Sequence, residues 1–271
     1  MDWLDLTIQG VVCVAACAAG WWAGRFRWAA ALAALAVAAI SLRLLFRFLP
    51  EAEFPLLTSS VYSDIRSQWV YPFAFLNIGI GLYRMRGWVW RAGLGTVGAL
   101  LLVTALSIPL TRATFHADDY LGAPDAGGIC LQTQDYTCGA AASATLLASR
   151  GIRTDEAEMA RLCGSAPLAG ADEIALCRAL THKLDGSGFG VALERPNDDA
   201  LARRQHPALA RVRSTLFRDH WVVLLAINDH AVIVADPLQG KVQLPVEEFL
   251  SQWRGILVTV ERMPTPAFAS R

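Results

Sequence analysis

Nearly all the long apolar runs of the chain lie within residues 6–110. Four such runs are separated by short polar stretches, at 6–24, 28–49, 69–83 and 88–110. A helix needs about 20 mostly apolar residues to cross the roughly 30 Å of hydrocarbon in a bilayer. Three of the runs meet this length, whereas 69–83 is shorter and contains Pro72. The pattern predicts an all-α transmembrane region of about four helices within residues 1–111.

Basic residues in the short loops indicate the orientation of these helices. The opening MDWLD has two aspartates and no basic residue, unlike the basic start of a cleavable signal. Arg25 and Arg27 lie between the first and second runs. Arg84, Arg86 and Arg91 lie around the loop between the third and fourth. Because cytoplasmic loops carry the excess of basic residues, we expect an integral protein of a bacterial inner membrane whose residues 113–271 are periplasmic.

The pattern changes after residue 111. Residues 112–128 are polar and contain Gly and Pro, which is typical of a linker, and 263–271 form a tail. In residues 129–262, helices are predicted at 139–149, 154–163, 172–181 and 245–253, and strands at 191–194, 208–213, 220–227, 231–235, 241–244 and 256–261. Three helices that precede a mostly antiparallel sheet define an α+β domain.

Composition and cysteine spacing exclude several classes of function. The formal net charge is zero, so no overall positive field favours nucleic acid. The six cysteines include no C-x-x-C pair, which argues against a structural zinc site.

Two other cysteine roles are considered. Cys163 and Cys177 flank a predicted helix–turn–helix and could form a disulfide in an oxidising compartment. Cys130 is interpreted as a buried residue, and a role as a resolving thiol stays open.

One cysteine stands where a thiol is reactive. Cys138 comes directly before the alanine-rich helix predicted at 139–149, in QTQDYTCGAAASATLL. A free thiol has a pKa of about 8.5, but a helix N-terminus and a cationic histidine can lower it to about 3.5–7.5. Gly139 would leave room for an approaching substrate. Gln132, six residues before Cys138, could donate its amide N–H to an oxyanion, and Gln134 is the alternative.

A nucleophilic thiol also needs a base, and the chain offers five histidines. His220 opens the most apolar strand, HWVVLLAI, and Asp236 lies sixteen residues later, at the end of the returning strand. Since residues 228–230 predict a hairpin turn, the two ends should be neighbours. We therefore expect Asp236 to lie beside His220 and to hold its tautomer. The other histidines are interpreted as linker, surface or hairpin-tip residues: His116, His182, His206 and His230.

Together these residues resemble those of the bacteriocin-processing, double-glycine leader cysteine peptidases of the papain-like clan. Members have a glutamine six residues before a Cys-Gly pair, a histidine that opens an apolar strand, and an Asp-Pro pair sixteen residues later. The matching positions, within about residues 126–262, are Gln132, Cys138-Gly139, His220 and Asp236-Pro237. The resemblance implies a papain-like fold in which Cys138 is the nucleophile and His220 the base. It also implies that Asp236 orients His220 and that Gln132 stabilises the oxyanion.

The chain departs from the transporter-fused members of this family at two points. Those members carry Asp directly before the nucleophile, where this chain has Thr137, and the sequence contains no G-x-x-x-x-G-K-[ST] motif for ATP. We therefore expect a stand-alone, membrane-anchored cysteine endopeptidase that requires no metal or cofactor. Its expected partners are the lipid bilayer and a peptide or protein substrate, such as the leader or propeptide of an exported protein. A secretion machine is a further candidate partner, and nucleic acid is not expected.

Two other functions use the same features. The same four residues, Gln132, Cys138, His220 and Asp236, could catalyse acyl transfer or amide hydrolysis on cell-wall peptides. Hydrolysis and transfer differ only in the nucleophile that attacks the acyl-enzyme. Alternatively, the domain could be a peptide-binding module of a secretion system. The intact Cys138 and His220 count against this last interpretation.

Overall fold

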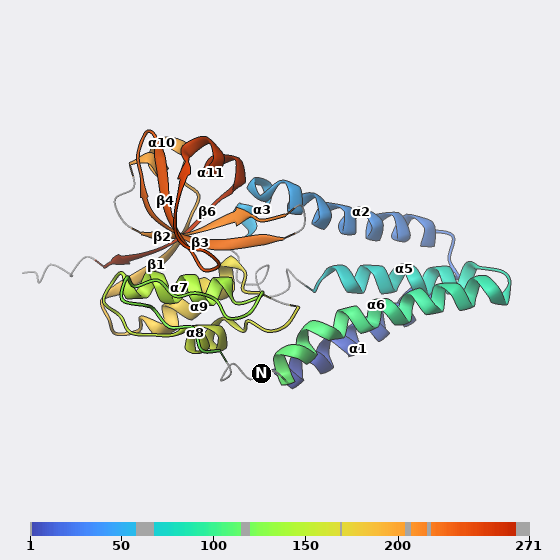
Figure 1. Cartoon of the computed structure of the whole chain (residues 1–271). Coiled ribbons are helices and arrows are strands. Elements are labelled where there is room, and N and C mark those ends of the chain that lie inside the picture. Colours follow the sequence, from blue (N-terminus) through green and yellow to red (C-terminus); the bar gives the residue numbers. More distant parts are fainter. Residues whose placement is uncertain are drawn as a thin grey trace, which may run out of the picture. The chain divides into compact units, whose positions relative to one another are not determined.

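The structure of the chain, a computed structural model, describes residues 2–57, 68–114, 120–168, 170–203, 207–215 and 218–263. Its internal contacts divide the chain into two compact units, Met1–Thr114 and Phe115–Arg271. Figure 1 shows the first unit as helices alone and the second as a sheet accompanied by helices. Residues 120–128, which the sequence assigns to a linker, belong to the second unit, where Tyr120 is buried.

The described part of the N-terminal unit consists of helices. They are α1 (Asp2–Ala23), α2 (Ala29–Phe48), α3 (Pro50–Leu57), α5 (Val70–Arg84) and α6 (Trp88–Thr114). Three stretches are long and apolar enough to cross a membrane, namely Leu4–Ala23, Ala29–Phe46 and Trp88–Thr114. The remaining predicted span, 69–83, corresponds to α5, whose 15 residues reach only about 22 Å at 1.5 Å per residue. By length, the described residues therefore contain three spans rather than four, and α3 is a helix that the sequence pattern does not predict.

Glycines allow α5 to pack closely against α1. A Cβ atom added to Gly20 would lie 2.1 Å from the Leu76 carbonyl oxygen, and one added to Gly79 would lie 2.0 Å from the Cys17 carbonyl oxygen. Small residues commonly permit such close backbone approach between membrane helices. The short α5 is therefore held by helix packing, with Ile78 among its buried residues.

The C-terminal unit is built on a six-stranded antiparallel sheet of order β1-β6-β2-β3-β4-β5. The strands are β1 (Phe189–Glu194), β2 (Ala208–Arg213), β3 (Asp219–Ile227), β4 (Ala231–Asp236), β5 (Gly240–Pro245) and β6 (Trp253–Arg262). Each predicted strand has its counterpart, and β3 and β4 form the predicted hairpin. The α+β class is confirmed.

Side-chain caps mark the starts of three of the described helices of this unit. The helices are α7 (Cys138–Ala148), α8 (Glu156–Cys163), α9 (Glu173–Lys183), α10 (Asp198–Ala202) and α11 (Val246–Gln252). The Asp155 carboxylate accepts the Glu158 N–H at the start of α8, and the Asp172 carboxylate accepts the Ala175 N–H at the start of α9. Such caps satisfy N–H groups that have no partner within the helix. Gly164 ends α8 with a φ of 65°, a conformation that favours glycine. The short α10 was not expected from the sequence.

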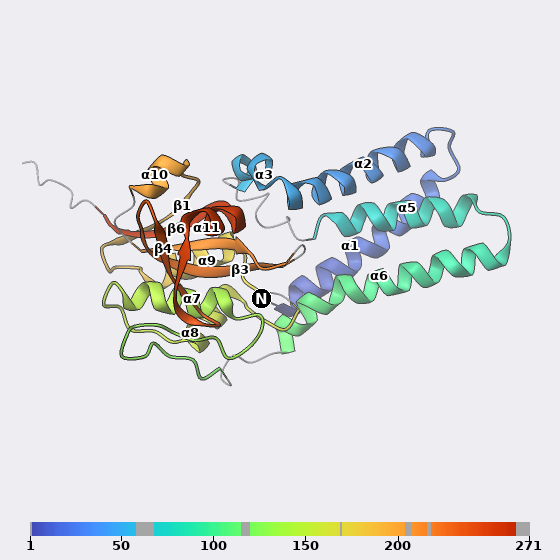
Figure 2. The same cartoon turned by 45° about the horizontal axis from the view of Figure 1, so that its top comes forward.

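Alternation along the strands separates two faces of the sheet. Val212, Val222 and Val234 share a hydrophobic core with Phe249 of α11, whereas Trp221 donates its indole N–H to the Ala171 carbonyl on the other side, at 3.0 Å. Figures 1 and 2 show α7, α8 and α9 gathered on that other side. Because side chains two residues apart share a face, His220 lies on the same face as Val222, and Asp236 on the same face as Val234.

Candidate active site

Cys138 is the first residue of α7, at the accessible end of an otherwise buried helix. Cys138 is partly exposed, whereas every residue from Gly139 to Leu147 is buried. The N–H groups of a first helical turn have no acceptor within the helix, and they carry the positive end of the helix dipole. The structure thus places the thiol where an anion is favoured.

Gly139 has a different role from the expected one. A Cβ atom at this position would lie 3.1 Å from Cδ2 of Leu176 and 3.2 Å from the Ala171 Cβ. Gly139 therefore lets α7 pack against α9 and the segment before it. The expectation that Gly139 leaves room for substrate was wrong, because the residue faces the interior.

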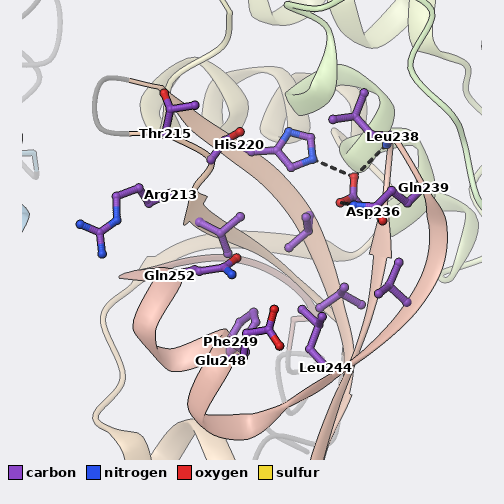
Figure 3. A pocket seen from close by; sticks show the side chains of 15 residues that line it. Arg213, Thr215, His220, Asp236, Leu238, Gln239, Leu244, Glu248, Phe249 and Gln252 are labelled. Carbon is purple, nitrogen blue, oxygen red and sulfur yellow. Dashed lines mark hydrogen bonds and ion pairs between the residues drawn. The ribbon is translucent and has the colours of Figure 1, made fainter.

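His220 and Asp236 are in direct contact. His220 Nε2 lies 2.8 Å from Asp236 Oδ1, and both residues are buried (Figure 3). The Leu238 N–H donates to the same carboxylate oxygen at 2.8 Å, and the Gln239 amide lies 3.4 Å from Oδ2. Burial alone would raise the pKa of Asp236, but these donors, led by His220, hold it below its usual value. The carboxylate is therefore charged and fixed in orientation.

The His220 imidazole interacts with Cys138 as well as with Asp236. Burial lowers the pKa of His220, but the hydrogen bond to Asp236, the hydrogen bond to Cys138 and the negative charges of both groups raise it to about 9. Because Asp236 occupies Nε2, the nitrogen left for Cys138 is Nδ1. The arrangement can hold a protonated imidazole that interacts with both the Asp236 carboxylate and the Cys138 side chain.

The contribution of Asp236 to this state can be tested by removing its charge. In Asp236→Asn the hydrogen bond can persist, but the pKa of His220 should fall from about 9 toward its ordinary range because the carboxylate charge is lost. NMR titration of the His220 ring measures the shift. The exposed Asp229→Asn, at the tip of the same hairpin, should leave the titration unchanged. An unaltered His220 titration in Asp236→Asn would contradict the assignment.

The same shift sets a pH dependence of stability. A histidine whose pKa is raised in the folded state from about 6.5 stabilises the fold fully below that value. This stabilisation is lost as the pH rises through about 9. The difference in unfolding free energy between wild type and Asp236→Asn should therefore shrink as the pH rises from about 6.5 to about 9.

Gln132 is hydrogen-bonded to the turn that follows Asp236. Its backbone N–H donates to the Pro237 carbonyl at 2.9 Å, and its side-chain amide donates to the Gln134 carbonyl at 2.7 Å. An amide group has two N–H donors, so one stays available for a further acceptor. Gln132 is partly buried, whereas the side chain of the alternative, Gln134, is exposed. The predicted oxyanion role stays a prediction, although the position of Gln132 is compatible with it.

The other described cysteines and histidines of the C-terminal unit are not among the partners of His220 and Asp236. Burial, the largest cause, and nearby carboxylates raise the pKa of Cys130 and of Cys177 to about 12, which disfavours their thiolates. Cys163 Sγ lies 3.2 Å from Ser165 Oγ, and all six cysteines are free, so the disulfide considered between Cys163 and Cys177 is absent. His182 and His230 are exposed, whereas His116 and His206 lie outside the described residues.

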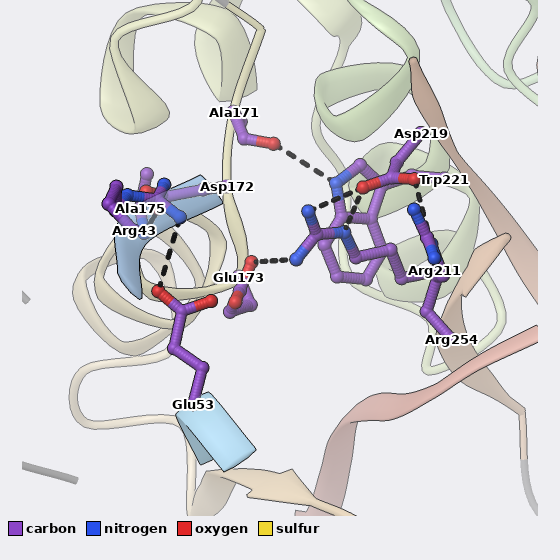
Figure 4. Close-up of polar contacts among 10 residues, drawn as sticks. All are labelled: Arg43, Glu53, Ala171, Asp172, Glu173, Ala175, Arg211, Asp219, Trp221 and Arg254. Atoms are coloured by element: carbon purple, nitrogen blue, oxygen red, sulfur yellow. Dashed lines mark hydrogen bonds and ion pairs between the residues drawn. The ribbon is translucent and has the colours of Figure 1, made fainter. Parts of the chain in front are cut away.

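Sequence reasoning missed a partly buried charge network on the opposite face of β3 (Figure 4). Arg211 contacts Glu173 at 2.9 Å and Asp219 at 2.5 Å, and Arg254 contacts Asp219 at 3.0 Å. Asp219 directly precedes His220, so the network anchors the start of β3 to β2, β6 and α9. No local pattern in the sequence gave a signal of it.

A groove of about 650 Å³ begins at His220 and Asp236 (Figure 3). Its apolar lining comes from the sheet and α11, and includes Val222, Leu244 and Phe249. Polar residues at its edges include Arg213, Thr215, Gln239, Glu248 and Gln252. Among the residues that the structure describes, no group of three or more His, Cys, Asp or Glu side chains could hold a metal ion.

Comparison with known proteins gives matches over the C-terminal unit. Residues 128–265 match the sequence model of the peptidase C39 family. An uncharacterized protein of Methanothermobacter marburgensis is 34% identical over 134 residues, which cover 49% of this chain and 88% of that protein. The lactococcin transport/processing ATP-binding protein LcnC-like of Lactococcus lactis is 29% identical over 143 residues, which cover 51% of this chain but only 19% of that protein.

Two solved structures are similar over the same region. The peptidase domain of Streptococcus ComA, a bi-functional ABC transporter, has 19% identity and a TM-score of 0.44, covering 49% of this chain and 96% of that domain. A double glycine motif protease from an AMS/PCAT transporter, in complex with the leader peptide, has 20% identity and a TM-score of 0.44, covering 55% of this chain and 96% of the protease.

Proposed function

The chain belongs to the peptidase C39 family, a family of cysteine peptidases, and from this premise we propose that it is a membrane-anchored cysteine endopeptidase. The observation that carries the proposal is the 2.8 Å contact between His220 and Asp236, together with the interaction of the same imidazole with the Cys138 thiol. A nucleophile, a base and a group that orients the base are the parts that covalent peptide hydrolysis requires.

The geometry supports a two-step reaction. The Cys138 thiolate attacks the substrate carbonyl carbon, and the carbonyl oxygen becomes an oxyanion stabilised by the Cys138 N–H and the Gln132 amide. His220 then gives its proton to the leaving amine as the C–N bond breaks. In the second step His220 takes a proton from water, the resulting hydroxide attacks the thioester, and the thiolate is released. Asp236 holds the imidazole in place throughout.

We assign the substrate to the class of leader or propeptide segments of exported proteins. The name of the Lactococcus relative describes transport and processing of lactococcin, and one similar solved structure holds a leader peptide. The groove supports an extended peptide substrate, because its apolar floor starts at the His220–Asp236 pair. The loop arginines favour a periplasmic location, with α1, α2 and α6 as the anchor.

The test is a comparison of exported-protein N-termini in three strains. One strain lacks the gene, one carries the wild-type gene and one carries Cys138→Ala. We expect at least one exported protein to keep its leader both in the deletion strain and in the Cys138→Ala strain, and to lose it with the wild type. Mass spectrometry of N-terminal peptides gives the readout. Identical N-termini in all three strains would overturn the proposal.

A further inference from the structure

A fully buried carboxylate lies behind the segment that carries Gln132 and Cys138. Glu156 opens α8 and has no solvent exposure. Its carboxylate accepts hydrogen bonds from the Gly122 N–H at 3.1 Å, from the Thr133 N–H at 2.8 Å and from the Thr133 hydroxyl at 2.8 Å, and it makes a short contact with the Thr137 hydroxyl. Among the described residues, no Lys or Arg pairs with it.

A buried carboxylate without a cation needs a full set of donors, because burial of a charge is costly. Glu156 obtains its donors from segments far away in the sequence, 19 to 34 residues before it. Two of the three donor residues flank the segment that joins Gln132 to Cys138. Thr133 directly follows Gln132, and Thr137 directly precedes Cys138. The carboxylate thus fixes both ends of this segment at once.

The contact with Thr137 has a consequence for α7. Thr137 is the N-cap residue of this helix, and a threonine at that position usually accepts a hydrogen bond from an N–H of the first turn. In this structure Thr137 makes no such cap, because its hydroxyl is turned to Glu156 and to the Gln134 carbonyl. The Thr137 side chain therefore does not accept a hydrogen bond from the N–H groups beside Cys138, and these groups stay available to another acceptor.

We propose that Glu156 is a positioning residue that holds Gln132 and the first turn of α7 in the geometry that binds the oxyanion. The proposal rests on the proposed function, since it concerns the oxyanion of the same reaction. Glu156 does not touch the substrate and acts only through Thr133 and Thr137. Its loss should therefore affect reactions that form an oxyanion at Cys138, and spare reactions of the thiol that form none.

Two probes of Cys138 separate these reactions without a known substrate. Acetyl-glycyl-glycinal forms a hemithioacetal, in which the new S–C bond turns the aldehyde oxygen into an oxyanion that takes up a proton. Iodoacetamide alkylates the thiolate with loss of iodide and forms no oxyanion. Both are measured on the full chain in detergent, with Cys138 identified by peptide mapping. Cys130 and Cys177 serve as internal controls of low reactivity, since their pKa values are raised to about 12.

In Glu156→Gln we expect aldehyde affinity to fall about 10²-fold, as for a comparable misplacement of catalytic groups, with the alkylation rate almost unchanged. Thr137→Val should show a smaller fall of the same kind, and Glu156→Asp should recover part of the affinity. The matched control is Glu158→Gln, on the same helix, because Glu158 instead pairs with Lys183 at 2.6 Å. It should leave both probes at wild-type values.

Three results would overturn the proposal. Aldehyde affinity that is unchanged in both Glu156→Gln and Thr137→Val would reduce Glu156 to a role in stability. An equal loss of affinity and alkylation would mean that the variants disturb the thiol rather than the oxyanion geometry. If the wild type does not bind the aldehyde, there is no oxyanion site for Glu156 to hold in place.

If Glu156→Gln does not fold, Thr137→Val decides between these results. If the wild type captures the aldehyde but the three strains have identical N-termini, the proposed function fails while the Glu156 comparison still stands.

Discussion

In His220→Ala, peptide cleavage is expected to fall about 10⁶-fold, as when the base of a catalytic triad is removed. The imidazole both supplies the positive charge beside the thiolate and returns a proton to the leaving amine. Cleavage of the substrate found in the three-strain comparison measures the loss. A decrease of less than tenfold would show that His220 is not the base.

Alkylation of Cys138 gives a second measure of the same variant. The pKa of His220 is raised to about 9, so its imidazole is cationic at neutral pH, and a neighbouring cation favours the thiolate form of a cysteine. In His220→Ala the rate of iodoacetamide alkylation at neutral pH should therefore fall, because the neighbouring cation is gone. His182→Ala changes an exposed histidine in the last turn of α9 and should match the wild type. An identical alkylation rate in His220→Ala would rule out the thiolate–imidazolium pair.

Gln132→Ala should lower kcat for peptide cleavage by about 10²–10³, the usual cost of losing one oxyanion donor. KM should change little, because the donor acts mainly on charge that develops in the transition state. Iodoacetamide alkylation should stay at the wild-type rate, since that reaction forms no oxyanion.

The matched control is Gln134→Ala, which also decides between the two glutamines that the sequence left open. The Gln134 side chain is exposed, and the contact that it makes to Gln132 uses only its backbone carbonyl. Gln134→Ala should therefore cleave at nearly the wild-type rate. A larger loss in Gln134→Ala than in Gln132→Ala would reverse the assignment.

Glu156→Gln and Gln132→Ala should produce the same pattern, with weakened capture of a carbonyl compound and normal alkylation. This similarity follows from the hydrogen bonds of Glu156 to Thr133, next to Gln132. In the double variant the two losses should be less than additive, because residues that share one network are coupled. Two fully additive losses would place Glu156 and Gln132 in separate networks.

Local patterns along the sequence were sufficient for the order of elements and for one long-range contact. The helix starts predicted at residues 154 and 172 lie within two residues of the observed starts of α8 and α9, because helix capping needs only residues within one turn. The contact between His220 and Asp236 could be predicted because a short hairpin turn fixes which residues of two strands become neighbours. The α+β class followed from the change of hydrophobic period along residues 129–262.

Only the tertiary structure decided the features that depend on distant segments. Arg211, Glu173 and Asp219 come from three elements, and nothing in the local pattern of any one of them selects the other two. Gly139 was misread because its neighbours, Leu176 and Ala171, lie more than thirty residues away. Glu156 stands at a helix start, where acidic residues are common, and its role depends on donors brought to it by folding. A buried polar group is defined by its partners, and the sequence around it does not name them.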